Sequence, residues 1–312
     1  MTELEMLVLN NIKKKHSFLE IMQICNLTEE QLCHIVLSLK NKGFSISNKY
    51  YYDGRLIYEF NKLIDLAKNY NNQIMMGKSD TSFSAILIAD THIGGEHESI
   101  DMLNRVYDLC AKQGEHIIIH CGDFIDSFVN ENANINNFIE RQAEQIARAL
   151  KVYPFDPTIF NFVCLGNHDL QALAKGNQNL AMAFENNRSD LIPIGWNSGT
   201  IKVKNDQVLV GHKVNKKFPI EAEEKVIVLG HKHYLSYELY KGKIIINVPA
   251  LDSSRRPILK VTLKLDKGLF ISGVVEEFTL GGGYNLGGFA KTNEIRFELE
   301  NNGEALKKVL KK

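Results

Sequence analysis

Short apolar segments that alternate with helical patterns constrain the fold more than any other feature of this 312-residue sequence. The strand-like segments lie at 84–89, 116–120 and 158–165, and the helical patterns lie near 100–113 and 135–153. Such alternation is typical of an α/β fold with a parallel sheet. After Gly199 the pattern changes to strands alone. The sequence therefore predicts an α/β body with a β-rich C-terminal portion.

Five of the apolar segments end in a cluster of Asp, Asn or His side chains. In chain order the clusters are Asp90-Thr91-His92, Gly122-Asp123-Phe124-Ile125-Asp126, Gly166-Asn167-His168-Asp169, Gly211-His212 and Gly230-His231-Lys232-His233. Ligands bind at the carboxyl ends of the strands of an open α/β sheet, so the clusters predict one converged site. Carboxylate, amide and imidazole ligands without thiolate suit divalent transition metals.

A single histidine is more often a satisfied surface or core residue than a ligand, and a lone D-x-H or Gly-Asp is weak evidence. Gly166-Asn167-His168-Asp169 is more informative, because three polar side chains directly after a buried strand are costly unless they find partners. Five such clusters in this order make chance a poor explanation.

The order D-x-H, G-D-x-x-D, G-N-H-D, G-H and G-H-x-H resembles that of the calcineurin-like metallophosphoesterases over residues 84–252. The resemblance implies an α/β/β/α sandwich of four layers with two divalent metal ions at the strand ends. It implies seven metal ligands, which are Asp90, His92 and His233 for one ion, Asn167, His212 and His231 for the other, and Asp123 for both. Four imidazoles favour Mn²⁺, with Fe or Zn²⁺ as alternatives, over Mg²⁺ alone.

The same resemblance implies catalytic roles for His168 and Asp126. A hydroxide shared by the two metals would attack phosphorus, and His168 would contact the phosphate and protonate the leaving oxygen. Asp126 would fix the tautomer of the His168 imidazole and raise its basicity. A helix-capping or supporting carboxylate is the alternative for Asp126. We expect Asp169 to cap its own turn.

The first 70 residues have a different pattern, with three helical segments followed by a hairpin. Thr28 and Gln31 predict a capping box, Gly43 predicts a helix stop, and Asp53-Gly54 predicts the hairpin turn. This pattern resembles a winged helix-turn-helix domain. The expected organisation is a small winged-helix-like domain over 1–70, a polar linker over 71–82, and a phosphoesterase domain over 83–312.

The charge of the chain leaves the partner of the N-terminal domain open. Lys and Arg number 37 and Asp and Glu number 37, so polyanion binding would need a local patch or bound cations. The third helix begins with Thr28-Glu29-Glu30, and its basic residues, Lys40 and Lys42, come only at its end. Nucleic-acid binding and protein contact therefore both remain interpretations of this domain.

The strings DTHIGG, GDFIDS and GNHD are most similar to those of nuclease subunits of DNA repair complexes. Protein phosphatases typically have Arg where this chain has Ser127, and G-N-H-E in place of G-N-H-D. We therefore expect a phosphodiesterase or nuclease that acts on nucleic acid. The alternatives are a nucleotide or cyclic-nucleotide phosphohydrolase, whose N-terminal domain makes protein contacts, and a DNA-binding regulator with an inactive core. The complete ligand set argues against the last.

Two further groups of residues are weaker candidates for contact with nucleic acid. The first is a set of basic residues after the last motif, namely Arg255, Arg256, Lys260, Lys264 and Lys267, and the second is the aromatic pair Tyr284 and Phe289. Solvated strand faces explain the basic residues equally well, and a mobile glycine-rich loop is the default interpretation of the segment that carries the aromatic pair.

The cysteines and the N-terminus indicate the cellular location. Five cysteines without a C-x-x-C pair are typical of a reducing compartment. The sequence has neither a secretory signal pattern nor a run of about 18 apolar residues. We therefore expect a soluble, cytoplasmic protein without membrane contact, and the sequence leaves homo-oligomerisation open.

Overall fold

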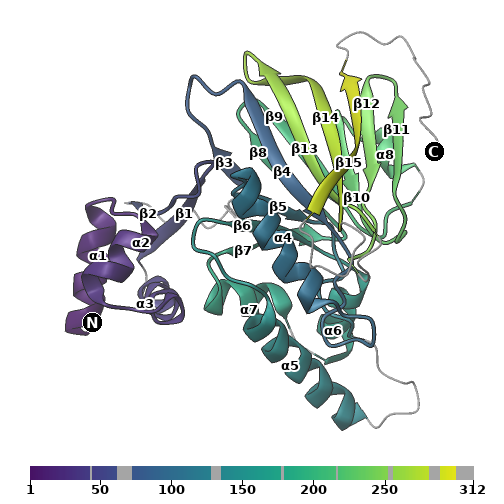
Figure 1. Ribbon diagram of the computed structural model, residues 1–312. Coiled ribbons are helices and arrows are strands. Elements are labelled where there is room, and N and C mark those ends of the chain that lie inside the picture. Colours follow the sequence, from purple (N-terminus) through teal and green to yellow (C-terminus); the bar gives the residue numbers. More distant parts are fainter. Residues whose placement is uncertain are drawn as a thin grey trace.

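The computed structural model of the protein describes residues 1–42, 44–61, 72–127, 135–176, 179–215, 217–251, 256–280 and 289–299. Within these ranges, a seven-stranded and an eight-stranded sheet face each other (Figure 1). This mixed α/β architecture confirms the predicted alternation of strands and helices. Every helix in the described part of the chain is too short or too polar to span a bilayer.

The seven-stranded sheet contains the strands that the sequence predicts at 84–89, 116–120 and 158–165. Its order is β15-β14-β13-β4-β5-β6-β7, in which β4 to β7 run parallel. The strands are β4 (Ser82–Ile88), β5 (Ile117–His120), β6 (Phe160–Leu165), β7 (Leu191–Trp196), β13 (Ile258–Asp266), β14 (Leu269–Leu280) and β15 (Phe289–Glu298). The helices that follow the parallel strands are α4 (Ile100–Gln113), α5 (Ile135–Val152), α6 (Asn167–Gly176) and α7 (Leu180–Asn187).

Alternation along β4 explains how this sheet is covered on both faces. Ile86 and Ile88 pack with Val106 of α4 in one hydrophobic cluster. Phe83 and Leu87 belong to another cluster, which fills the space between the two sheets. Because successive strand residues point to opposite faces, a strand that is apolar throughout must be buried on both sides.

The eight-stranded sheet combines C-terminal strands with strands from the N-terminal region. Its order is β11-β12-β10-β9-β8-β3-β1-β2. The strands are β1 (Ser45–Tyr51), β2 (Leu56–Asn61), β3 (Gln73–Met75), β8 (Ser198–Val203), β9 (Asp206–Gly211), β10 (Val226–Leu229), β11 (Ser236–Tyr240) and β12 (Lys243–Asn247). On its outer face, Leu209 and Ile227 pack with Phe218 of α8 (Phe218–Glu221). A four-layer sandwich should have helices on that face, and among the described residues α8 is the helix that packs there.

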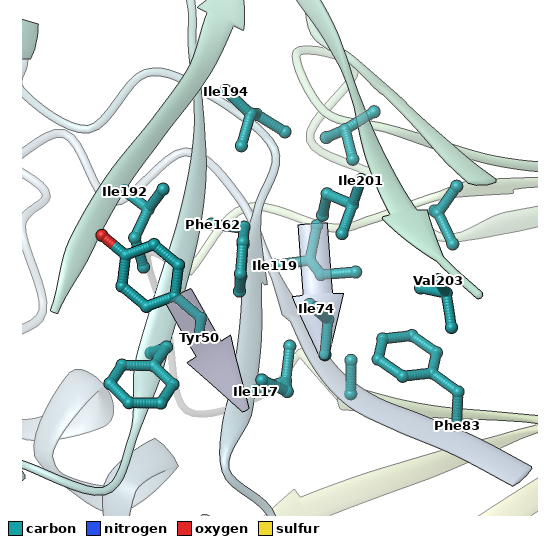
Figure 2. Close-up of a cluster of buried hydrophobic side chains, with 14 of the residues drawn as sticks. Tyr50, Ile74, Phe83, Ile117, Ile119, Phe162, Ile192, Ile194, Ile201 and Val203 are labelled. Carbon is teal, nitrogen blue, oxygen red and sulfur yellow. The ribbon is translucent and has the colours of Figure 1, made fainter. Parts of the chain in front are cut away.

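The strand β3 lies within the segment that the sequence predicts as a polar linker, residues 71–82. It pairs in parallel with β1 on one side and with β8 on the other. Ile74 is 1% exposed, and Figure 2 shows it between the sheets beside Tyr50, Ile201 and Ile119. The polar linker is therefore wrong for this part of the segment, and the position of the domain boundary remains a prediction.

The N-terminal module, defined here as residues 1–61, contains the three predicted helices and the hairpin. The helices are α1 (Glu3–Lys13), α2 (Phe18–Cys25) and α3 (Glu29–Asn41), and each begins with a capping box. The box of Thr28 and Gln31 and the hairpin of β1 and β2 confirm the predictions made for them. Gly43, Arg255 and Tyr284 lie outside the described residues. Whether the module is a winged helix remains a prediction.

The N-terminal module contacts the amino ends of the parallel strands. Gly54, with φ of 80°, lies so close to the body that an added Cβ would come within 2.6 Å of the Thr158 carbonyl oxygen. Ser189, which precedes β7, donates hydrogen bonds of 3.1 Å from its backbone N–H and 2.8 Å from its hydroxyl to Glu29 of α3. Because the predicted site lies at the carboxyl ends, the module sits at the opposite end of the body.

The Glu29 contact predicts that stability depends on pH. Burial of Glu29, together with the charge of Asp190, raises the pKa of its carboxyl from 4.5 to about 8. The neutral form therefore stabilises the fold, and its contribution is complete below pH 4.5 and is lost as the pH rises through about 8. We expect urea unfolding to show that the free energy of unfolding falls by an amount on the order of 1–3 kcal/mol between these limits. The E29Q variant should lose this pH dependence because an amide does not ionise, and it keeps the oxygen that accepts from Ser189. An E29Q variant with the wild-type pH dependence would contradict this, and Glu30→Gln, at an exposed position, is the control.

Candidate metal centre

The five polar clusters meet where strands of the two sheets end. β4, β5 and β6 run parallel in one sheet, and β9 and β10 run parallel in the other. Asp90, Asp123 and Asn167 follow the first three strands, and His212 and His231 follow the last two. Parallel strands present their carboxyl ends at one edge, so two short groups of strands bring distant parts of the chain together.

Several of these residues have an unusual backbone conformation. The φ angles are 54° at Asp90, 43° at His92, 53° at Asp123, 71° at His231 and 58° at His233. A residue other than glycine costs roughly 1–2 kcal/mol in this left-handed region. Strain at consecutive strand ends is typical of functional sites, where it aims side chains at one point.

Asp90, His92 and His233 form the first group of candidate metal ligands. One ligand atom from each lies within 4.8 Å of the other two. Asp90 Oδ1 is 3.2 Å from His233 Nε2 and 3.9 Å from His92 Nε2. The other oxygen of Asp90 accepts a hydrogen bond of 3.1 Å from the His231 backbone N–H, which fixes the carboxylate.

Asp123, His212 and His231 form the second group, again within 4.8 Å of one another. Asp123 Oδ2 is 2.9 Å from His212 Nε2 and 3.9 Å from His92 Nε2, so it lies between the two groups. The structure thus brings together the residues that the resemblance implies as ligands, with Asp123 in the shared position. Their roles as ligands remain predictions.

Unpartnered buried atoms show that divalent metals fit this arrangement. Within the described residues, Asp90 Oδ1, His92 Nε2 and Asn167 Oδ1 are buried without a hydrogen-bond partner, and the buried His212 Nε2 meets the Asp123 carboxylate at 2.9 Å. A buried polar atom without a partner is costly, and all four are atom types that coordinate metals. The buried oxygen of Asn167 is an amide carbonyl, the atom type that the resemblance implies as a ligand at this position.

Asp123 and His212 form an ion pair within the site. Burial opposes ionisation of Asp123, but the hydrogen bond and charge of His212 outweigh it and hold the pKa of Asp123 at about 2. In turn, burial opposes the charged form of His212, but Asp123 raises the pKa of His212 above its usual value. Protons and metal ions therefore compete for the same imidazole nitrogen, and acid should weaken metal binding.

His168 lies beside the shared carboxylate. Its backbone N–H donates a 2.9 Å hydrogen bond to Asp123 Oδ1, and its Nε2 is 3.8 Å from Asp123 Oδ2. Its Nδ1 bonds to the backbone carbonyl oxygen of Asp126, which can only accept, so Nδ1 carries the proton. The Asp126 carboxylate is farther away, at 3.9 Å from His168 Nδ1 and 3.5 Å from His92 Nδ1. The predicted contact between Asp126 and His168 is thus made through the main chain.

Asp169 joins two of the ligand-bearing loops. It is 0% exposed, and its carboxylate accepts backbone hydrogen bonds from Gly166 at 2.8 Å, Ile125 at 3.0 Å and Phe124 at 3.1 Å. The bond to Gly166 confirms the expected cap of its own turn. The bonds to Phe124 and Ile125 extend this role to the loop that carries Asp123.

His120 is a residue that the sequence reasoning missed. It is buried at the end of β5, where Gly122 N–H donates to its Nδ1 at 3.2 Å and its Nε2 lies 3.0 Å from Thr91 Oγ1. Thr91 Oγ1 in turn donates to the Phe124 carbonyl oxygen at 2.9 Å. Burial, with the charge of His212, lowers the pKa of His120 to about 3, so it is neutral and connects the first loop to the second. Its signal was a histidine that ends an otherwise apolar strand.

Comparison with known proteins identifies the family. Residues 83–246 match the calcineurin-like phosphoesterase family, and this match covers more than half of the chain. The chain therefore belongs to this family, whose members use divalent metal ions, and it is a metal-dependent phosphoric ester hydrolase. No curated protein matches the sequence.

Several solved structures are similar in fold. A dimetal phosphatase from Danio rerio shares 9% identity at a TM-score of 0.42, covering 71% of this chain and 100% of that chain. The phosphoesterase Yfce from E. coli shares 15% identity at a TM-score of 0.35, covering 61% and 98%. The nuclease MPE from Pseudomonas putida shares 15% identity at a TM-score of 0.32, covering 62% and 84%.

Replacing Asp169 should loosen the metal centre. The D169N variant would turn an amide N–H₂ toward backbone N–H groups and leave at least one of them unpaired. We expect the free energy of unfolding to fall by about 2–4 kcal/mol, and metal affinity to fall with it. Denaturant unfolding with and without chelator measures both effects. Asp156→Asn, which alters a turn cap at Thr158, is the control, and equal losses in the two variants would contradict the joining role.

Metal binding should stabilise the fold through the predicted ligands. We expect Mn²⁺ at roughly 100 times its dissociation constant to add about 2.7 kcal/mol of stability, seen as a higher melting temperature. The Asp123→Asn and His212→Ala variants should lose most of this increase. His97→Ala, at an exposed histidine, should keep it. If Asp123→Asn gained as much stability from Mn²⁺ as the wild type does, Asp123 would not be a ligand.

Proposed function

We propose that this hydrolase cleaves phosphodiester bonds in nucleic acid, with Mn²⁺ as its preferred metal. The observation that carries the proposal is the convergence of the candidate ligands and His168 where strands of the two sheets end. The strings DTHIGG, GDFIDS and GNHD, which resemble those of DNA repair nucleases, support nucleic acid as the substrate class. The absence of Arg at Ser127 disfavours the protein phosphatases.

The ligand residues would hold two cations in this proposal. Asp90, His92 and His233 would bind one, Asn167, His212 and His231 would bind the other, and Asp123 would bind both. When bound, two divalent cations supply charge neutralisation for a phosphate and lower the pKa of water. The backbone bonds from His231 to Asp90 and from His168 to Asp123 hold both carboxylates in place for this task.

His168 is the proposed general acid. Hydrolysis forms a P–O bond from water and breaks the P–O bond to the leaving group, whose oxygen must gain a proton. The Asp126 carbonyl holds the proton on Nδ1 of His168, so Nε2 is the nitrogen that can exchange a proton with substrate. Nε2 faces Asp123 Oδ2 and thus the shared metal position. His168 would give its Nε2 proton to the leaving oxygen and regain one from solvent.

The proposed acid predicts a loss of activity that depends on the leaving group. A nucleoside alkoxide needs a proton in order to leave, whereas p-nitrophenolate does not. We expect His168→Ala to lower kcat by about 10²–10⁴-fold on a dithymidine dinucleotide and by much less on bis(p-nitrophenyl) phosphate. Steady-state kinetics with Mn²⁺ measures both, with His97→Ala as the control. Full activity of His168→Ala on the dinucleotide would show that another group is the acid.

The alternative function is hydrolysis of nucleotides or cyclic nucleotides, with the N-terminal module used for protein contacts. One observation favours a role of the module away from the substrate: α3 packs on α7, and its Glu29 carboxyl accepts two hydrogen bonds from Ser189, so the module is attached to the body at the end away from the metal centre. A panel of single-stranded DNA, double-stranded DNA, cyclic nucleotides and p-nitrophenyl phosphate separates the readings. Activity confined to the monoester would overturn the phosphodiesterase proposal, and activity confined to cyclic nucleotides would establish the alternative.

A binding measurement can test whether the N-terminal module holds nucleic acid. Its most basic stretch is Lys13, Lys14 and Lys15, all exposed, at the end of α1. Because the module contacts the body at the end away from the metal centre, we expect replacement of all three by Ala to leave the affinity for a short oligonucleotide within about twofold. A larger loss, measured by fluorescence anisotropy, would assign the module to the polymer.

A further inference from the structure

We propose that Tyr234 is a stacking platform for a nucleobase next to the scissile phosphate, with Lys232 and Lys213 binding the adjoining backbone. This inference rests on the proposed function and narrows its substrate to a phosphodiester that carries an unstacked base. It depends on a set of side chains around the metal centre that the ligand motifs do not explain.

Tyr234 is exposed in an unusual position. It is 54% exposed, the highest value among the described aromatic side chains. It directly follows His233, so its Cα lies about 3.8 Å from that of a candidate metal ligand. Stacking of a base on this exposed ring would bury apolar surface of both groups, and a base has a flat face of matching size.

The loop that carries Tyr234 is held from both sides. His231 and His233 are in the left-handed region, and the His231 N–H donates to Asp90. On the other side, the Arg256 guanidinium donates to the backbone carbonyl oxygen of His233. The ring is therefore carried by a fixed backbone, and little conformational entropy is lost when a base stacks on it.

Positive charge lies beside the ring and on the neighbouring loop. The Lys232 ammonium lies 5.9 Å from the centre of the Tyr234 ring, and Lys232 is exposed. Lys213, also exposed, directly follows His212 on the neighbouring loop. An aromatic face flanked by cations is the combination that binds unpaired nucleotides, because the base stacks while the phosphates meet the lysines.

A second lysine–tyrosine pair offers a matched control. Lys241 lies 5.2 Å from the ring centre of Tyr240, at the other end of β11. β12 runs parallel to β10, and β11 runs antiparallel to β12, so β11 leads away from the metal centre. About 13 Å of strand separates Ser236 from Tyr240. The Tyr240→Ala variant therefore removes a similar pair outside the proposed site.

The test compares substrates that differ only in the nucleoside. Thymidine p-nitrophenyl phosphate, as its 5′ and 3′ isomers, is compared with methyl p-nitrophenyl phosphate in the presence of Mn²⁺. We expect Tyr234→Ala to lower kcat/KM about 5–100-fold on at least one thymidine isomer, mainly through KM, and less than about twofold on the methyl ester. Tyr234→Phe should keep the wild-type values, because it retains the ring, and so should Tyr240→Ala. An equal effect of Tyr234→Ala on all three substrates would overturn the inference.

A binding measurement separates this inference from the proposed function. A fluorescein-labelled oligothymidylate is titrated with wild-type, Tyr234→Ala and Tyr240→Ala protein, and no turnover is needed for the readout. If the wild type hydrolyses none of the diesters, the proposed function fails. If the wild type is active but Tyr234→Ala binds the oligothymidylate as tightly as the wild type, only the platform fails. We expect the melting temperatures of both variants to stay close to that of the wild type, which would show that the variants are folded.

Discussion

The metal centre depends on one buried carboxylate, that of Asp169, which is not among the predicted ligands. Asp169 bonds to the backbone of its own turn and to that of the loop after β5, so the loops that carry Asn167 and Asp123 hold a fixed separation. The bonded series of His120, Thr91 and the Phe124 carbonyl attaches the first loop to the same framework. Several candidate ligands can keep a left-handed backbone because these buried hydrogen bonds leave the loops few other conformations.

The candidate site could be predicted from the sequence because each ligand cluster directly follows a strand. Parallel pairing then requires the clusters to meet, even though Asp90 and His233 are far apart in the chain. The contacts around the ligands could not be predicted in this way. Asp126 approaches His168 through its carbonyl oxygen, and a main-chain group has no signature in the sequence. His120 ends an otherwise apolar strand, but a single buried histidine does not reveal in the sequence which loops it connects.

The fold was predictable where structure is local. The capping boxes of α1 to α3 involve residues three apart, and the turn at Gly54 is encoded in two. β3 escaped prediction because only Ile74 of its three residues is buried, which is too little for any periodicity. The helix α6 was not predicted because its first turn contains Asn167, His168 and Asp169, and these polar motif residues interrupt the apolar spacing by which a helix is recognised. Pairing of β3 with β1 and β8 is long-range, and strand propensity does not determine partners.

Continuity of the eight-stranded sheet has a consequence for how the chain can be divided. β3 is the only link, among the described strands, between β8 and the hairpin of the N-terminal module. A fragment that starts at the family match, residue 83, would lack β3 and expose the backbone of β8 as an open edge, together with the apolar face formed by Ile201 and Val203. An open strand edge can pair with a strand of another molecule, so we expect the isolated catalytic region to self-associate. β3, with the hairpin of the N-terminal module beyond it, thus covers this edge of the enzyme.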